Sequence, residues 1–293
     1  MDDRKKPVCF FALLYLMCVS TNAEDNLTNV DFVQRFNPDG AVVCVQGVVN
    51  GTKAKMVLDT GTPFHIYGLE LKTVLRGIME LEDGVEETPT ASYTCDPQDI
   101  WLGSFCNNDL RSLVTNLSAL RIAINEKIDG VVGMPLLSQN VIQLDFEKGI
   151  VRIGKECSLS RKSIVSLHFD ENDLPHVVDL KADDIRFACL LDTGMSNAVS
   201  LSQKYFDAFQ QLELISSVGS TRMIKIGQTR NVKTGVLGEI RIGGHRLTNV
   251  PVHLSDTNKI GVGLLRKFHV CIDMPNRELI LLPNRNFAHP FTP

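Results

Sequence analysis

The sequence lacks the features that mark several large classes of protein. Its 293 residues carry a formal net charge of −4, and no extended run of lysine and arginine offers nucleic acid a basic face. No segment has low complexity, which argues against a disordered scaffold. Beyond the N-terminus, no apolar stretch is long enough to cross a membrane. We therefore expect a globular protein that binds no nucleic acid and keeps no membrane span once its leader is removed.

Motifs for metal and phosphate chemistry are also missing. The cysteines form no Cys-x-x-Cys pair and the histidines no His-x-x-x-His pair, so we predict no metal site. No Gly-x-Ser-x-Gly elbow is present, although sequence order alone leaves a serine or cysteine triad open. Gly243-Gly244 lies between apolar runs and predicts a hairpin turn rather than a phosphate loop. We predict no cofactor.

The N-terminus has the order of a secretory signal peptide. A basic group at residues 4–6 precedes an apolar run from Val8 to Val19, and small and polar residues follow up to Ala23. We predict that residues 1–23 are removed and that the protein is secreted or periplasmic, with an uncleaved membrane anchor as the alternative. Six cysteines then remain, and of their possible pairs we predict only the Cys95–Cys106 disulfide, because both lie in one loop-rich stretch.

The remaining chain contains an internal repeat. An apolar segment leads into Asp59-Thr60-Gly61, and a second leads into Asp192-Thr193-Gly194. Further along each half stands a segment that ends in glycine, the largely apolar 128–133 and its counterpart 258–261, and an aspartate follows twelve residues after each glycine. These aspartates, Asp145 and Asp273, fall in expected hairpins and are predicted to serve turns.

Local patterns repeat with the same spacing. Asn50-Gly51 predicts a hairpin between 41–49 and 53–58, and Asp183-Asp184 predicts its counterpart between 177–180 and 186–191. A helix is expected after each triplet, from apolar positions at 71–79 and again at 205–215. Closing hairpins are expected at 141–153 and 270–282. Two similar halves in sequence order suggest a pseudo-twofold axis, with the two triplets facing each other across it.

Two such triplets point to chemistry. Average composition predicts only about 0.06 Asp-Thr-Gly triplets in a chain of this length, and a single one would most often be a turn. Aspartate supplies a carboxylate on a short side chain, threonine a hydroxyl that can brace the loop, and glycine allows close approach. Two adjacent carboxylates share one proton, so one member can take a proton from water while the other polarises a peptide carbonyl.

The sequence resembles the aspartic protease superfamily at these residues. Leu58-Asp59-Thr60-Gly61 and Leu191-Asp192-Thr193-Gly194 look like its active-site loops, and 128–133 resembles the hydrophobic-hydrophobic-glycine segment behind each loop. Residues 260–273 resemble the C-terminal equivalent in pepsin-like and retropepsin-like enzymes. The likeness covers roughly residues 40 to 283 and is closest to a fused pair of retropepsin-like units.

The resemblance implies a mainly β, bilobal fold of two similar β-barrel-like lobes related by a pseudo-twofold axis, with few short helices. We assign residues 24–155 to the N-terminal lobe, 156–163 to a linker and 164–293 to the C-terminal lobe. Asp59 and Asp192 are the expected catalytic pair. Thr60, Gly61, Thr193 and Gly194 are expected to support the active-site loops, with the threonines bonding across the axis.

The sequence departs from the family pattern beside both triplets. Thr62 and Met195 stand where the family commonly has alanine or serine, and Lys259 stands where an apolar residue is usual. We expect Thr62 and Met195 to line the substrate pockets, with Ile66 and Val199 behind the loops; the alternative is that Met195 only packs between the lobes. Tyr93 and Trp101 are the aromatic candidates for a flap, although each fits a packing role better.

Three functions are compatible with these observations. The first is a secreted, monomeric aspartic endopeptidase that acts on peptides or proteins, with an optimum between about pH 4 and 6.5. The second is an inactive or weakly active peptide-binding protein of the same fold. The third is a two-carboxylate glycosidase, which leaves the threonines, glycines and repeat unexplained.

Overall fold

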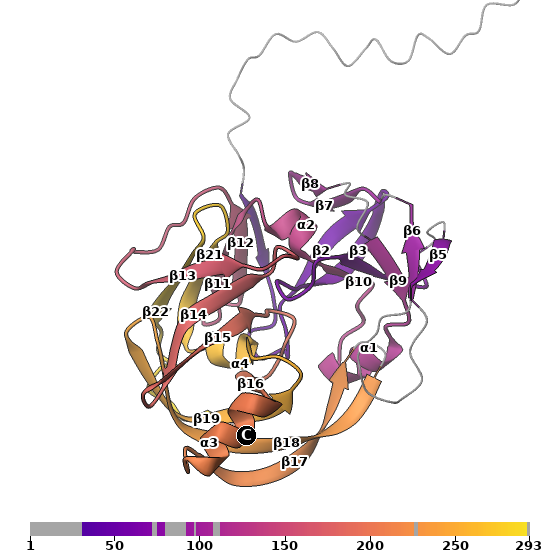
Figure 1. Cartoon of the computed structure of the whole chain (residues 1–293). Coiled ribbons are helices and arrows are strands. Elements are labelled where there is room, and N and C mark those ends of the chain that lie inside the picture. The colour runs from indigo at the N-terminus through magenta and orange to yellow at the C-terminus, as the bar shows by residue number, and fades with distance from the viewer. Residues whose placement is uncertain are drawn as a thin grey trace, which may run out of the picture. The chain divides into compact units, whose positions relative to one another are not determined.

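The computed structural model describes residues 31–71, 75–79, 92–96, 98–107, 112–225 and 228–291. These residues form a mainly β protein with two sheets, one of which curls into a half-barrel (Figure 1). The expectations for the signal peptide and for a membrane anchor fall on residues outside these ranges. Within them, no helix has the length and apolar character needed to cross a membrane.

One sheet is formed by strands from the first half of the sequence. Most neighbouring strands in this sheet pair antiparallel. Two pairs are parallel: β3 (Thr52–Leu58), which leads into the first triplet, with β10 (Gly130–Val132), and β4 (His65–Gly68) with β9 (Ser112–Thr115). In spatial order the strands are β5 (Leu75–Met79), β6 (Ser92–Cys95), β9 (Ser112–Thr115), β4 (His65–Gly68), β10 (Gly130–Val132), β3 (Thr52–Leu58), β2 (Cys44–Val49), β7 (Ile100–Leu102) and β8 (Phe105–Asn107).

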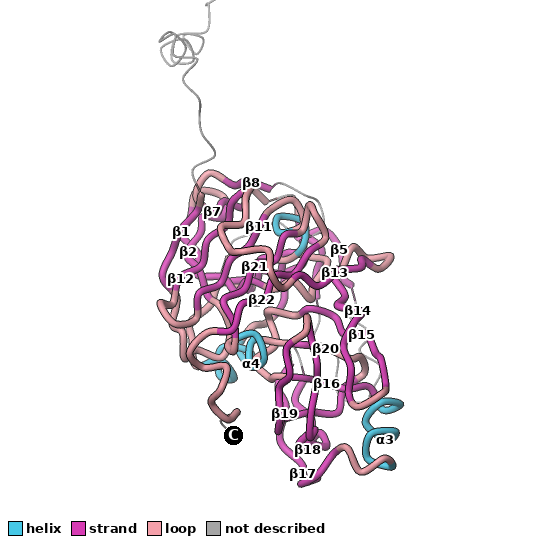
Figure 2. The backbone as a smooth tube through the Cα atoms, turned by 90° about the vertical axis from the view of Figure 1, so that its left-hand side faces the viewer, coloured by secondary structure: helices cyan, strands magenta, loops and turns pink. Residues whose placement is uncertain are grey.

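The other sheet draws on both halves of the sequence. Figure 2 shows its strands running from β1 and β12 through β21 and β22 to β17 and β18. In spatial order they are β1 (Phe32–Arg35), β12 (Ile150–Gly154), β11 (Val141–Asp145), β21 (Phe268–Asp273), β22 (Glu278–Pro283), β13 (Ile164–Phe169), β14 (Pro175–Ala182), β15 (Ile185–Leu191), β20 (Lys259–Ile260), β16 (Val199–Ser202), β19 (His245–Ser255), β18 (Gln228–Ile242) and β17 (Ile215–Lys225).

The predicted hairpins are present, and their turns show why. Asn50 and Gly51 both have positive φ, at 47° and 76°, which is the geometry that an Asn-Gly turn between two strands favours. Asp183 has φ 51° between β14 and β15, and Gly243-Gly244 turns β18 into β19. The closing hairpins β11–β12 and β21–β22 also form, and β11 pairs with β21 at the junction of the two halves.

The prediction of a helix at 71–79 is wrong, because Leu75–Met79 forms strand β5 and pairs with β6. The second predicted helix forms as α3, which buries Phe206 and Phe209, but it ends at Gln211, and Ile215 begins strand β17 instead. Its apolar positions follow helical spacing, whereas the shorter run at 75–79 fits either structure until a partner strand is available. The described helices are α1 (Ser118–Ile124), α2 (Met134–Leu137), α3 (Gln203–Gln211) and α4 (Val262–Leu265).

The two triplets stand over a continuous hydrophobic core. Side chains from both halves contribute to it, including Met56 and Leu58 below the first triplet and Leu191 below the second. All three are at most 2% exposed. Burial of one such side chain contributes roughly 1.5–3 kcal/mol, so the strands that end in the triplets are held firmly.

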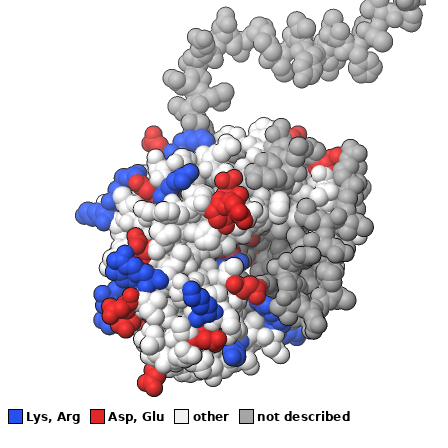
Figure 3. All heavy atoms as spheres, viewed as in Figure 1, with Lys and Arg blue, Asp and Glu red and all other residues white. Residues whose placement is uncertain are grey.

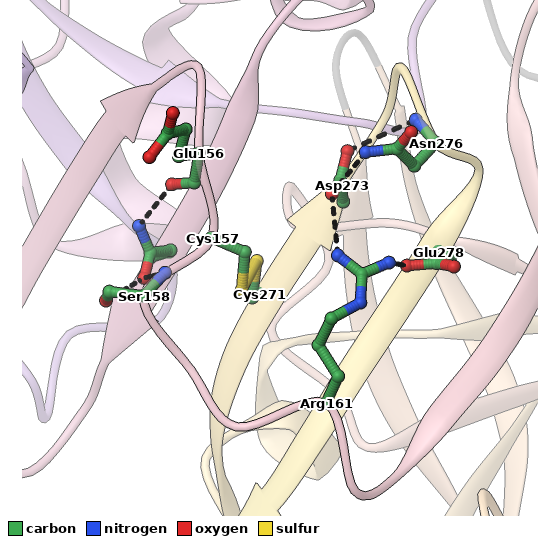
Figure 4. Close-up of a disulfide and its surroundings, with 9 residues drawn as sticks. Glu156, Cys157, Ser158, Arg161, Cys271, Asp273, Asn276 and Glu278 are labelled. Atoms are coloured by element: carbon green, nitrogen blue, oxygen red, sulfur yellow. Dashed lines mark hydrogen bonds and ion pairs between the residues drawn. A yellow bond between two sulfur atoms is a disulfide. The ribbon is translucent and has the colours of Figure 1, made fainter.

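The predicted Cys95–Cys106 disulfide is absent, and Cys157 bonds to Cys271 instead. Cys95 lies on β6 and Cys106 on β8, near opposite ends of their sheet, which keeps the two thiols apart. Figure 4 shows the Cys157–Cys271 bond joining the segment after β12 to strand β21, which lies between β11 and β22. Beside it, Ser158 donates to the Gln143 side chain at 2.6 Å, so this segment is also held by hydrogen bonds.

Candidate active site

Asp59 and Asp192 follow directly on two strands that end in the same way. The Asp59 N–H donates to the Val132 carbonyl at 3.0 Å, and the Asp192 N–H donates to the Ile260 carbonyl at 2.9 Å. Each acceptor belongs to the short strand that runs parallel to the aspartate's own strand, β10 beside β3 and β20 beside β15. The repeat in the sequence is therefore a repeat in hydrogen bonding.

The threonines of the two triplets bond to each other's loops. The Thr60 N–H donates to Thr193 Oγ1 at 3.1 Å, and the Thr193 N–H donates to Thr60 Oγ1 at 3.2 Å. Thr193 Oγ1 donates to the Leu58 carbonyl at 2.8 Å, and Thr60 Oγ1 donates to the Leu191 carbonyl. Both side chains are buried. These reciprocal bonds hold the two loops in contact.

The triplet glycines leave room for the opposite carboxyl. A Cβ at Gly61 would overlap the Asp192 carboxyl, and a Cβ at Gly194 would overlap that of Asp59. Each glycine is therefore required by the close approach of the other triplet. The structure thus brings together all six residues that the sequence analysis assigned to the two loops.

The Asp59 carboxyl is strongly perturbed by its surroundings. Burial above all, together with the charge of Asp192 and a side-chain hydrogen bond with it, raises the pKa of Asp59 to about 8. The Gly61 N–H, which donates to Asp59 Oδ1 at 2.7 Å, and the Lys259 ammonium act in the opposite direction. Asp59 therefore keeps its proton at neutral pH, as one member of a proton-sharing pair does.

Lys259 is the charged neighbour that the sequence analysis left out of the site. Its Nζ lies 2.9 Å from Asp192 Oδ2, and Asp192 is only 6% exposed. In the first half the position two residues before the glycine is Val131, which is buried among apolar side chains. A charge in place of that valine was the signal in the sequence, but only the fold brings the lysine to the aspartate.

The predicted pocket residues are partly buried beside the triplets. The Thr62 carbonyl accepts from the Met134 N–H at 3.0 Å, and the Met195 carbonyl accepts from the Val262 N–H at 2.8 Å. Met195 also packs its methyl group against Gly261 and accepts a hydrogen bond from Ser200 Oγ. Ile66 and Val199, which were expected behind the loops, are both buried.

The other predicted residues lie away from the triplets. Asp145 and Asp273 accept backbone N–H groups in their hairpin turns, at 3.0 and 3.1 Å, which confirms their structural role. Tyr93 lies on β6 and packs against the core, and Trp101 lies on β7 with 42% of its surface exposed. Among the described residues, no group of three acidic, histidine or cysteine side chains is arranged to hold a metal.

A separate cavity of about 250 Å³ lies beside β1 and β2. Its walls include Arg35, Cys44 and the ion-paired Lys55 and Glu126, and neither triplet contributes to it.

On the face shown in Figure 3, acidic and basic side chains are interspersed rather than gathered by sign.

A scan against protein-family models finds no match for this chain. A search of curated proteins also finds no significant relative.

Proposed function

We propose that this protein is an aspartic endopeptidase whose catalytic pair is Asp59 and Asp192. The observation that carries the proposal is the reciprocal bonding of Thr60 and Thr193, which joins two loops that each carry an aspartate. The raised pKa of Asp59 adds support, because a shared-proton pair needs one carboxyl that stays protonated. A pair of structural turns has no need of either feature.

The proposed architecture is the bilobal fold of the aspartic proteases, with a pseudo-twofold axis between two lobes. Matched pieces of the halves support it, namely β3 with β15, β10 with β20 and α2 with α4. The axis would pass between β11 and β21, where Gln143 lies opposite Cys271 in the middle of the pairing. Substrate would cross the junction of the lobes as an extended strand.

The proposed reaction is hydrolysis of a peptide bond without a metal or a covalent intermediate. The ionised carboxyl accepts a proton from water as the water oxygen bonds to the carbonyl carbon, and the protonated carboxyl gives its proton to the carbonyl oxygen. The carboxyl that took the water proton then gives it to the amide nitrogen, and the C–N bond breaks. The other carboxyl takes a proton back from a hydroxyl of the tetrahedral intermediate as the carbonyl re-forms. Both carboxyls end the cycle with one proton between them.

The second candidate is a peptide-binding protein of the same fold that does not cleave. The ion pair between Lys259 and Asp192 favours it, because a bound ammonium weakens a carboxylate as a base. Secretion, a monomeric state and a peptide or protein substrate are further proposals, and they follow from the leader at 1–23 and from the resemblance at the triplets.

Cleavage of a mixed peptide library, with and without pepstatin, tests the proposed activity. We expect pepstatin-sensitive cleavage by the wild type and a loss of at least about 10³-fold in Asp59→Asn and in Asp192→Asn. Asp145→Asn is the matched control, because Asp145 is, like Asp59, an aspartate of the first half that recurs in the second half, but its carboxylate serves a hairpin turn. Binding of peptides without cleavage would favour the second candidate, and cleavage retained by either dyad variant would refute the assignment.

A further inference from the structure

We propose that Lys259 is a positioning residue that decides which member of the pair is ionised, making Asp192 the base and Asp59 the acid. This inference rests on the proposed function, since it assigns roles within the same pair. It begins from the charged side chain of Lys259, which lies beside Asp192 in the second half where the first half has Val131.

A symmetric pair would give its proton no preferred side. The threonine bonds, the parallel strands and the close glycines are alike in the two halves, so they favour neither carboxyl. Lys259 and its counterpart Val131 are not alike. A cation 2.9 Å from Asp192 Oδ2 stabilises the ionised form of that carboxyl, and no positive charge comes from Val131.

Lys259 lies on the short strand β20, which pairs with β15 and with β16. The two strands paired with β20 put Leu190 and Ser200 opposite Lys259, and neither side chain titrates in the working range. The charged groups that act on the Asp59 carboxyl are Asp192 and Lys259. The hydrogen bond from the Gly61 N–H favours the ionised form of Asp59, but burial outweighs it. Lys259 therefore determines the direction of the asymmetry.

The position of the lysine also suits the proposed reaction. With Asp192 ionised, the proton of the pair resides on Asp59, ready for the carbonyl oxygen. The ammonium stays a spectator: it forms no bond to substrate in any step and gives up no proton. Its charge lowers the pH at which the pair loses its first proton, so the ionised base persists under more acidic conditions.

The test compares Lys259→Met, which keeps an aliphatic stem, with Lys259→Arg, which keeps the charge. Lys259→Val, which copies the residue of the first half, is a second neutral variant in case one fails to fold. Lys148→Met removes the same charge from a pairing with Asp145 in a hairpin turn and is the matched control. Aspartate carboxyl carbons are followed by NMR across pH, with Asp59→Asn and Asp192→Asn used to assign the two signals.

We expect the first ionisation of the pair to move to higher pH by about 1 to 3 units in the neutral variants and to stay in place in Lys259→Arg and Lys148→Met. In the wild type the Asp192 signal should carry this step, and in Lys259→Met the two signals should share it. The acidic limb of the kcat/KM profile should move with the titration. An unchanged titration in both neutral variants, or an equal shift in Lys259→Arg, would overturn the inference.

The carboxyl titration keeps this test separate from the proposed activity. If no form of the protein cleaves peptides but the titration moves as expected, the endopeptidase proposal fails and the role of Lys259 stands. If Lys259→Met cleaves faster than the wild type at every pH while the titration stays in place, Lys259 blocks the pair and the inference is wrong.

Discussion

The two Asp-Thr-Gly loops share a frame and differ in what surrounds it. In the first half, the Gly133 N–H donates to the ring of the buried His65, whereas in the second the Gly261 N–H donates to the Ala198 carbonyl. The first half places Val131 beside its aspartate's strand and the second places Lys259 there. The two halves therefore share the backbone contacts that join the loops and differ in the neighbouring side chains.

Contacts that hold the two loops together occur in both halves, whereas the charge beside an aspartate occurs in one. The threonine bonds and the glycine contacts occur in both halves, because each loop must be held against the other. The charge of Lys259 occurs once, and an effect that must distinguish two carboxyls can only come from a feature that occurs once. The same substitution of Thr60 and of Thr193 should therefore lower the free energy of unfolding by similar amounts. The same substitution of Asp59 and of Asp192 should change it by different amounts.

The largest expected difference between the two halves is in the effect of their aspartates on stability, which should have opposite signs. The pKa of Asp59 is raised from 3.8 to about 8 on folding, so the folded state keeps a proton that the unfolded state loses. Its contribution to the free energy of unfolding therefore falls as pH rises from about 4 to 8. Asp59→Asn removes this loss and should stabilise the protein by on the order of 2 kcal/mol at pH 7, and by much less at pH 4.

Asp192→Asn should instead destabilise the protein by about 1–2 kcal/mol at pH 7, because Lys259 loses its carboxylate partner beside a buried site. Urea unfolding of both variants and the wild type at pH 4 and pH 7 measures the difference. Equal effects of the same sign in the two variants would show that the loops are electrostatically equivalent.

Next in size is the effect of the two threonines. Thr60→Val removes a hydroxyl that bonds the Thr193 N–H and the Leu191 carbonyl, and Thr193→Val does the same to the opposite loop. Each should lower the free energy of unfolding by about 2–4 kcal/mol, since two buried polar groups lose their partner. The double variant should cost less than the sum, because the bonds are shared. Chemical denaturation gives all four values, and a difference above about 2 kcal/mol between the single variants would break the match between the halves.

The smallest expected effect is on substrate selection. Met195 is apolar and adaptable, and it lies directly after the second triplet, so we expect a preference for hydrophobic residues flanking the cleaved bond. Met195→Ala should change that preference by about 1 kcal/mol, or roughly fivefold, while Thr62→Ala changes a different subsite. Cleavage-site profiles of a peptide library measure both. An unchanged profile in Met195→Ala would mean that Met195 only packs against Gly261.

Local signals in the sequence predicted much of the fold. Asn50-Gly51 and Gly243-Gly244 specify their turns through backbone preferences that act within two residues, so the hairpins around them could be read directly. The strand at Leu75–Met79 could not, because its identity depends on pairing with β6. The same holds for Cys157 and Cys271, which are 114 residues apart in sequence.

The candidate site likewise contains residues that the sequence predicted and a contact that it could not predict. The repeat and the triplets identified Asp59, Asp192 and the four loop residues, because a duplicated motif carries its own evidence in one sequence. The departure at Lys259 was visible, but nothing in the sequence could say which carboxyl its ammonium would reach. Side-chain reach depends on the register of β20 against β15, which is set by the packed sheet.

The disulfide between Cys157 and Cys271 has a practical consequence for anyone who handles the protein. A single cut anywhere between these cysteines leaves two fragments that remain covalently joined. Such a nicked molecule would migrate as one intact band on a gel without reductant and as two bands with it. A preparation that digests itself within this span would therefore pass as homogeneous until a thiol is added to the sample.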